Sequence, residues 1–167
     1  MVCLLVSVLV YLALALSIIG IFYAGLWAFA LWCSRGLLVG ELRGTAVRVH
    51  ERQFPRVHSE VVRLCEQLRI GVPEVYVMQA GGLLNAFAMR FAGRDYVVIY
   101  ADVFELSLDG GDDALAFMLA HELSHLQRRH PLKHMWLAPA MMVPFLGAAY
   151  SRACERTCDR MATALRP

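Results

Sequence analysis

Apolar residues form one long, uninterrupted stretch at the start of the chain. Residues 2–33 contain no charged side chain. As one straight helix this stretch would be roughly 48 Å long, whereas the hydrocarbon core of a bilayer is about 30 Å thick. It therefore predicts a transmembrane anchor over 1–34, either one tilted, overhanging helix or a tight hairpin of two short helices that turns at 17–20. The length of the run disfavours a buried core helix.

Basic residues lie on only one side of this anchor. No Lys or Arg precedes it, and a cleavable signal peptide is disfavoured because it needs a basic start and a shorter apolar core. Arginines follow the anchor closely: Arg35, Arg43, Arg48, Arg52 and Arg56. The positive-inside rule predicts an inner or plasma membrane protein whose chain after residue 34 faces the cytoplasm.

Beyond the anchor, apolar residues alternate between helical and strand-like spacing. A Gly- and Arg-containing linker is expected over 35–50, followed by a helix over 51–70 that Gly71 and Pro73 end. Three short runs predict β-strands: 75–78, 85–91 and 96–100. The last two should pair as an antiparallel hairpin, because a glycine-containing turn separates them.

Helical spacing returns in the last third of the chain. Three helices are predicted there: 103–108, 112 to about 130, and 151–165. Asp112 and Asp113 favour a helix start, because carboxylates cap free N–H groups and interact well with the helix dipole. The pattern indicates an α+β fold for 51–167, mostly helical with a small antiparallel sheet.

A second apolar stretch, residues 135–150, is a poor candidate for a membrane crossing. It has 16 residues, fewer than a span usually needs, and it contains Pro139 and Pro144. Basic residues flank it on both sides, which suits two cytoplasmic ends. We predict a re-entrant, interfacial or buried helical segment.

Composition supports a membrane protein and argues against nucleic acid as a partner. Apolar residues make up 59% of the chain, against about half in soluble domains. The net charge is only +2, and the sequence has no Gly-rich phosphate loop. The five cysteines are odd in number and form no CxxC, so neither a disulfide framework nor a zinc ribbon is indicated.

The motif H-E-L-S-H at 121–125 indicates the chemistry. Residues i and i+4 lie on one face of a helix, so His121 and His125 can bind the same metal ion. Zinc accepts neutral imidazole nitrogens, and a catalytic site keeps one position open for water. Glu122 adjoins the first ligand and can take a proton from that water, whose pKa zinc lowers.

Two histidines do not complete such a site, so a third ligand is expected from another helix. His130 does not fit the longer HExxHxxGxxH spacing, which leaves a carboxylate. Glu155 and Asp159 are four residues apart and share a helix face, so Glu155 can bind zinc while Asp159 orients a ligating imidazole. The alternative is that both carboxylates pair with neighbouring arginines on an exposed helix face.

The sequence S-R-A-C-E-R-T-C-D at 151–159, together with HExxH, closely resembles the S-R-x-x-E-x-x-A-D pattern of HtpX-like membrane metallopeptidases, which are relatives of the CAAX prenyl endopeptidases. The N-A-F-A segment at 85–88 is similar to one found upstream in that family. The resemblance covers roughly residues 50–162. It implies a zincin-like metallopeptidase domain after an N-terminal membrane anchor.

The resemblance also implies roles for individual residues. It implies one Zn²⁺ bound by His121, His125 and Glu155, with Glu122 as the base. A strand near Asn85 is expected to line the cleft, and Asn85 and Arg152 are candidate substrate-binding residues. The implied substrates are membrane or misfolded proteins cut at the cytoplasmic face.

The chain departs from the family in two places. Cys158 stands where the family usually has Ala, which a packed helix tolerates. Family members also continue well beyond the position of Pro167, so either the metallopeptidase domain is C-terminally truncated or some substrate-binding groups are missing. Three side chains are candidates for stabilising the oxyanion: Arg152, His130 and His134.

Two other functions compete with an anchored peptidase. One is a membrane-anchored scaffold or binding protein that derives from such an enzyme and has lost its activity. The other is an intramembrane protease with HExxH inside a membrane-spanning helix, which the charged residues soon after His125 disfavour. The oligomeric state is not indicated by the sequence.

Overall fold

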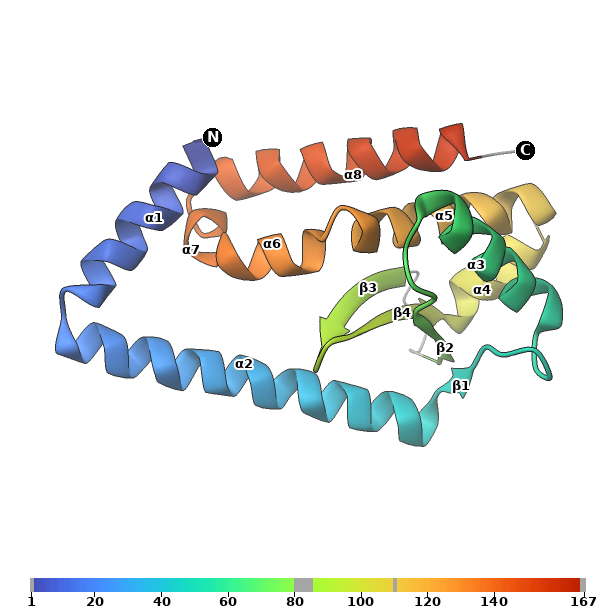
Figure 1. The fold of residues 1–167 in the computed structure, drawn as a ribbon, viewed down its shortest axis with the longest axis horizontal. Helices are drawn as coiled ribbons and strands as arrows, with labels where there is room; N and C mark the ends of the chain where they lie inside the picture. The colour runs from blue at the N-terminus through green and yellow to red at the C-terminus, as the bar shows by residue number, and fades with distance from the viewer. Residues whose placement is uncertain (1, 80–85, 110, 166–167) are drawn as a thin grey trace.

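The computed structural model describes residues 2–79, 86–109 and 111–165. Its elements follow in chain order: α1 (Val2–Ala15), α2 (Ile18–Thr45), β1 (Val47–Arg48), α3 (Pro55–Leu68), β2 (Glu74–Met78), β3 (Ala86–Phe91), β4 (Arg94–Tyr100), α4 (Ala101–Asp109), α5 (Asp112–Gln127), α6 (His130–Trp136), α7 (Ala138–Met141) and α8 (Leu146–Ala164). The described chain is mostly helical around one small sheet, as the sequence predicts (Figure 1).

The sheet has the strand order β1-β2-β4-β3 and is mixed. The predicted hairpin of β3 and β4 is confirmed, with Phe87 opposite Val98 in an antiparallel register. The prediction of an antiparallel sheet is wrong for β2 and β4, which run parallel with Tyr76 beside Val98. The reason is that the chain passes β2, forms β3 at the outer edge and returns through β4 between them, so β4 has the direction of β2.

The N-terminal apolar stretch consists of two helices that open into a V (Figure 1). The break lies at Leu16 and Ser17, where the Ser17 hydroxyl accepts a hydrogen bond from the Gly20 N–H at 3.2 Å and caps α2. A Cβ at Gly20 would lie 2.6 Å from the carbonyl oxygen of Leu14, so only glycine permits this close approach. The V differs from both expected forms, a single helix and a tight hairpin.

Helix α2 continues without interruption to Thr45, so most of the expected linker is helical. Val39 and Leu42 in its second half are buried against one face of the sheet, with Tyr76 and Tyr96. Helices α3 and α5 cover the other face, where Val97 and Ile99 join the main core. The sheet is thus enclosed between α2 and the α3–α5 layer.

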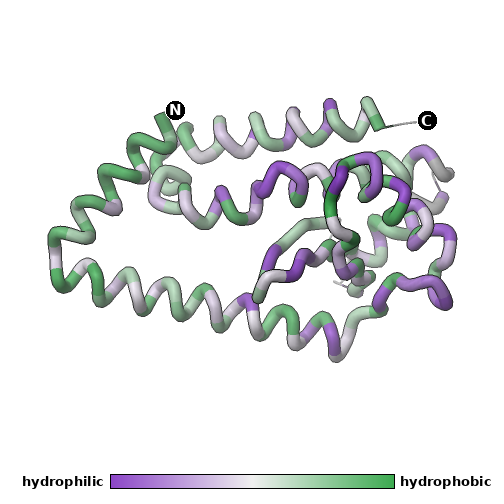
Figure 2. The backbone as a smooth tube through the Cα atoms, viewed as in Figure 1, coloured by the Kyte–Doolittle hydropathy of each residue, from purple (hydrophilic) through white to green (hydrophobic). Residues whose placement is uncertain are grey.

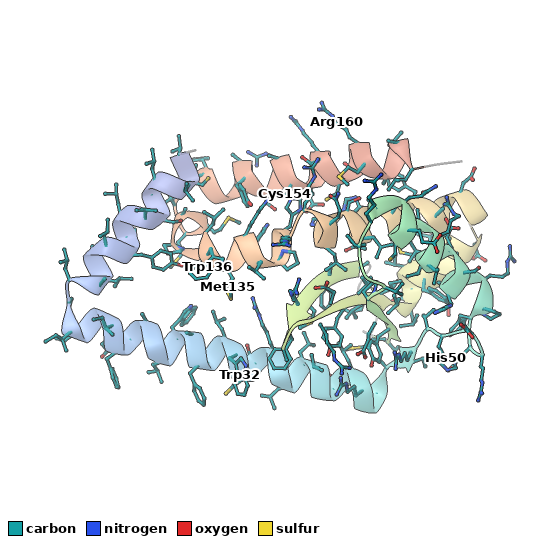
Figure 3. All side chains as sticks on the ribbon, in the orientation of Figure 1. Trp32, His50, Met135, Trp136, Cys154 and Arg160 are labelled. Carbon is teal, nitrogen blue, oxygen red and sulfur yellow. The ribbon has the colours of Figure 1, made fainter. Side chains whose placement is uncertain are left out.

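The first half of α2 is apolar and exposed. Every residue over 21–30 is exposed, and α2 is the one helix in the described chain that is long and apolar enough to cross a membrane. Figure 2 shows hydrophobic colour along α1 and this half of α2, and Figure 3 shows many of their side chains projecting outwards. An apolar surface of this size marks a site of contact with lipid or protein.

The apolar stretch 135–150 forms a turn between helices. It ends α6, forms α7 and begins α8, so that α8 reverses direction and packs along α5 (Figure 1). Ala140 is buried in this turn, and a Cβ at Gly147 would collide with the carbonyl of Met141. Both ends of the segment therefore lie on the same side of the turn.

Candidate active site

Helix α5 presents the histidines of the HExxH motif on the face turned away from the core. Leu119 and Leu123 of this helix are buried against the sheet and α3. The side chains of His121 and His125 keep 17% and 16% of their surface exposed, and their ring centroids are 5.0 Å apart. The i,i+4 spacing therefore places both rings side by side, as predicted.

Helix α8 brings a carboxylate to this pair. Oε2 of Glu155 lies 3.1 Å from Nε2 of His121 and 3.6 Å from Nε2 of His125, and the two Nε2 atoms are 3.2 Å apart. Three potential ligand atoms thus converge from two helices, although His121 and Glu155 are 34 residues apart in the sequence. The geometry favours the ligand interpretation of Glu155 over an exposed, arginine-paired face.

These three atoms could hold a metal ion, and their spacing is compatible with zinc. Zinc binds imidazole nitrogen and carboxylate oxygen at about 2.0–2.2 Å in a tetrahedron, which places neighbouring donor atoms roughly 3.3 Å apart. The separations of 3.1, 3.2 and 3.6 Å surround this value. Burial lowers the pKa of His125, which favours the neutral imidazole that a metal requires.

Asp159 lies on the other side of the His121 ring. Its Oδ1 is 3.0 Å from Nδ1 of His121, one helical turn beyond Glu155. In the tautomer that keeps the proton on Nδ1, His121 donates to this carboxylate and its Nε2 lone pair faces Glu155 and His125. The arrangement is the one expected for a carboxylate that orients a metal-binding imidazole.

Glu122 lies between the two histidines in the sequence and is 8% exposed. Burial raises the pKa of its carboxyl to about 7, opposed by His121 and assisted by the charge of Glu155. A cation held by the neighbouring ligands would act in the opposite direction and favour the carboxylate. The protonation state of Glu122 is therefore set by burial in one direction and by a bound cation in the other.

The far side of the His125 ring contacts His130, which the sequence offered only as a candidate for stabilising the oxyanion, and His130 in turn contacts Cys158. Nδ1 of His130 lies 3.1 Å from Nδ1 of His125, and Sγ of Cys158 lies 3.6 Å from the same His130 atom. His130 is 6% exposed, and burial, assisted by nearby basic groups, lowers its pKa to about 4. The available signals were the five-residue spacing from His125 and the Pro131 that follows.

For the remaining candidate residues, the structure gives no direct contact with the three ligand atoms within the described part of the chain. Asn85 lies outside the described residues, and Arg152 is exposed on α8, three residues before Glu155. The ring of His134 lies 5.4 Å from that of Tyr150. Burial lowers the pKa of His134 while Glu155 opposes this, so His134 shares the electrostatic environment of the site.

Comparison with known proteins identifies the family. The family model "Peptidase family M48" matches residues 51–148, more than half of the chain. The chain belongs to peptidase family M48. The M48 match contains the HExxH helix and ends before Glu155 and Asp159.

Two curated relatives agree with this M48 membership. The plastoglobule-localized metallopeptidase 48 of Arabidopsis thaliana is 30% identical over 138 residues, which is 71% of this chain and 38% of the relative. A protease HtpX homolog of Halobacterium salinarum is 35% identical over 83 residues, which is 47% of this chain and 26% of the relative. The resemblance to HtpX-like metallopeptidases is confirmed, and the aligned regions make up well under half of either relative's length.

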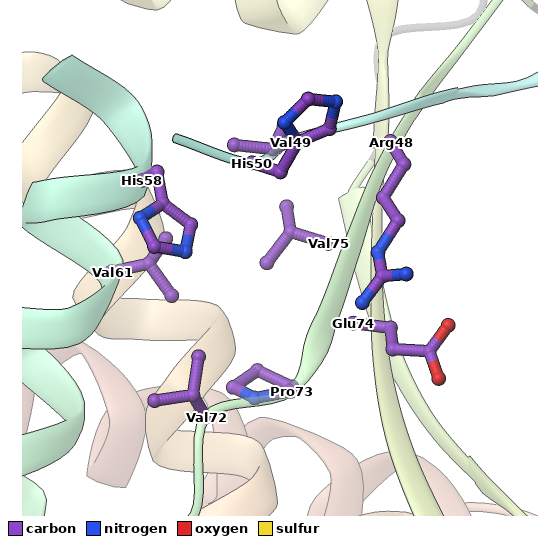
Figure 4. A pocket seen from close by; sticks show the side chains of 9 residues that line it. All are labelled: Arg48, Val49, His50, His58, Val61, Val72, Pro73, Glu74 and Val75. Atoms are coloured by element: carbon purple, nitrogen blue, oxygen red, sulfur yellow. The ribbon is translucent and has the colours of Figure 1, made fainter. Parts of the chain in front are cut away.

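A separate hollow of about 270 Å³ lies between α3 and the strands β1 and β2 (Figure 4). Val61, Val72 and Val75 line it together with His50 and His58, and it contains none of the three convergent ligand atoms. Nδ1 of His50 already accepts a hydrogen bond from the Arg52 N–H at 3.1 Å. The candidate active site of this M48 chain is therefore the α5–α8 cluster and not this hollow.

Proposed function

We propose that this chain is a membrane-anchored zinc metalloendopeptidase with a zincin-like catalytic domain that faces the cytoplasm. His121, His125 and Glu155 hold one Zn²⁺, and Glu122 is the general base. The observation that carries this proposal is the convergence of the three ligand atoms within 3.1–3.6 Å across α5 and α8. Membership of family M48 supports the reaction class.

The residues of the site have separate tasks in peptide hydrolysis. When bound, zinc polarises the scissile carbonyl and makes a water molecule acidic. Glu122 would accept a proton from the attacking water and return it to the leaving amine, which is the task of a general acid–base group. Asp159 holds the His121 ring so that Nε2 remains available to the metal.

Polypeptides are the proposed substrates, in particular membrane or misfolded proteins. Strand β3 is at the edge of the sheet and contacts α5, so its outer edge is available for main-chain pairing with an extended peptide. Asn85, immediately before β3, and Arg152, on α8, remain the proposed substrate-binding residues. Peptide pairing with an edge strand is independent of side-chain sequence, which suits a protease of unfolded segments.

Membrane anchoring is proposed from the exposed apolar surface. The first half of α2, together with α1, presents apolar side chains outwards, and a lipid bilayer is the proposed partner. The α7 turn adds exposed Met142 and Phe145, and it packs against α1. The arginines that follow the anchor support a cytoplasmic catalytic domain.

The decisive experiment compares the full chain with its Glu122→Gln variant in detergent or lipid vesicles. The unmodified chain should bind one Zn²⁺ and cleave casein, and chelation should abolish the cleavage. Glu122→Gln should still bind Zn²⁺ but lose about 10²–10⁴-fold in kcat, because the acid–base group is gone. Zinc binding without cleavage by the unmodified chain would favour the inactive scaffold, and equal cleavage by Glu122→Gln would remove Glu122 as the base.

A further inference from the structure

The connection between α5 and α6 is built in a way that returns one side chain to the site. Arg129 has a left-handed backbone with φ 55, although it is not glycine. Such a conformation is unfavourable for a residue with a Cβ. Pro131 then lies in the first turn of α6, where its missing N–H is not needed. The turn places His130 beside α5 instead of in solvent.

His130 is enclosed although its neighbours in the sequence are not. Arg128 and Arg129 are exposed, whereas His130 is 6% exposed. Its ring lies edge-on to that of His125, with centroids 5.0 Å apart and an angle of 76° between the planes. The thiol of Cys158 on α8 is 3.6 Å from Nδ1 of His130. The His130 ring is thus fixed by contacts from α5 and α8.

The 3.1 Å contact between the Nδ1 atoms of His125 and His130 requires one proton between them. If His125 carries it, His125 donates to the lone pair of His130 and its own Nε2 has a free lone pair. If His130 carries it, Nε2 of neutral His125 must be protonated and cannot bind a metal. Because Nε2 of His125 faces His121 and Glu155, only the first arrangement is compatible with a metal there.

We propose that His130 is a positioning residue of the metal site: its Nδ1 accepts a hydrogen bond from Nδ1–H of His125 and keeps Nε2 of His125 free for the metal. This inference rests on the proposed function. His130 would then orient His125 in the same way that Asp159 orients His121. Each imidazole of the HExxH motif is then oriented from its Nδ1 side.

The same cluster has a competing interpretation as a metal site of its own. One atom each from His125, His130 and Cys158 lie within 4.8 Å of one another. A metal there would use Nδ1 of His125 as a ligand. It would compete with the metal proposed beside Glu155 for the same imidazole ring. We favour the hydrogen bond, because it needs only neutral groups and leaves the thiol protonated.

The test uses two substitutions of His130 in the full chain. His130→Leu removes the acceptor, whereas His130→Asn retains a side-chain oxygen near the position of Nδ1. Zinc affinity is measured by competition with a chromophoric chelator, and the thermal midpoint of each metal-free protein is recorded. We expect His130→Leu to weaken zinc binding about 10–100-fold and His130→Asn to restore most of it.

Cys158→Ala is the matched control, because it alters the same cluster without removing the acceptor. Its zinc affinity should stay within about threefold of the unmodified chain, below the effect of losing an orienting partner. Equal zinc affinity in His130→Leu would overturn this inference alone, as would equal losses in His130→Leu and His130→Asn. A second zinc that Cys158→Ala removes would also overturn it in favour of a separate metal site. No zinc binding by the unmodified chain would overturn the proposed function as well.

Discussion

Nδ1 of His121 lies 3.0 Å from Oδ1 of Asp159, on the side of the ring opposite to its contact with Glu155. One imidazole of α5 is thereby held between two carboxylates of α8 that are one helical turn apart. A neutral ring in this position donates through Nδ1 and offers the Nε2 lone pair. Asp159 consequently determines which nitrogen of His121 is free to face a metal.

Removing this carboxylate should weaken the site without emptying it. Asp159→Ala leaves all three proposed ligands in place but removes the acceptor that orients His121. We expect zinc affinity to fall about 10–100-fold, measured by chelator competition. Arg160→Ala, at an exposed position on the same helix, is the control and should change the affinity little. An Asp159→Ala protein with unchanged affinity would show that the contact does not orient the ring.

Zinc should also join two parts of the fold. Because His121 and Glu155 belong to different helices, a metal that binds both stabilises the packing of α5 against α8. A ligand present at a thousand times its Kd adds about 4 kcal/mol to the free energy of unfolding. Zinc should therefore raise the thermal midpoint of the unmodified chain, and chelation should lower it again.

Glu155→Gln provides the comparison for this stabilisation. The substitution retains the size of the side chain but removes the charge of the proposed ligand, so most of the zinc-dependent shift in the thermal midpoint should disappear. Differential scanning fluorimetry with and without zinc measures both proteins. A shift of the same size in Glu155→Gln would mean that the stabilising metal binds elsewhere.

The grouping of the candidate site's residues could be predicted from the sequence because the spacing within each pair is local. The pairs His121–His125 and Glu155–Asp159 are each four residues apart, and the helical period alone places each pair on one face. That the two faces meet is a property of the α5–α8 packing. The sequence indicated that these two helix faces meet only through its resemblance to HtpX-like peptidases.

The features that were missed depend on distant contacts. The parallel pairing of β2 with β4 depends on residues more than twenty positions apart, which strand patterns do not reveal. Helix α2 continues through several glycines because Val39 and Leu42 pack on the sheet, and this tertiary packing outweighs local helix propensity. The contact of His130 with His125 depends on the left-handed turn at Arg129, which the spacing of the two histidines does not reveal.

The carboxylate of Glu74 should make the stability of the sheet depend on pH. Burial alone would raise its pKa, but hydrogen bonds from Tyr76 at 2.9 Å and Arg94 at 3.0 Å, with other nearby arginines, lower it. A carboxyl whose pKa is lower in the folded state contributes stability above its unfolded value, and this is lost as the pH falls through the folded value.

Glu74→Gln should therefore lower the free energy of unfolding by about 1–2 kcal/mol at neutral pH, because the charge-assisted hydrogen bonds are weakened. Since protonated Glu resembles Gln, the difference should shrink below about pH 4. Denaturant unfolding of both proteins at neutral and acidic pH checks this. A difference that grows towards acid would contradict the assigned direction of the pKa shift.

Accessibility to a membrane-impermeant thiol reagent should show which of the two apolar segments crosses the membrane. The proposed ligands His121 and Glu155 lie on either side of 135–150, so one crossing by this segment would place them in different compartments. We expect Lys133→Cys and Arg156→Cys, both at exposed positions, to react only from the cytoplasmic side.

Phe22→Cys gives the matched contrast in the same experiment. Phe22 is 69% exposed in the protein, yet it should not react from either side in vesicles, because lipid surrounds this part of α2. Cys3 and Cys33 are replaced beforehand to remove background labelling. Reaction of Lys133→Cys and Arg156→Cys from opposite sides would refute both the topology and the shared metal. Reaction of Phe22→Cys in intact vesicles, with both other positions cytoplasmic, would instead mean that this part of α2 is exposed to water and does not lie in the bilayer.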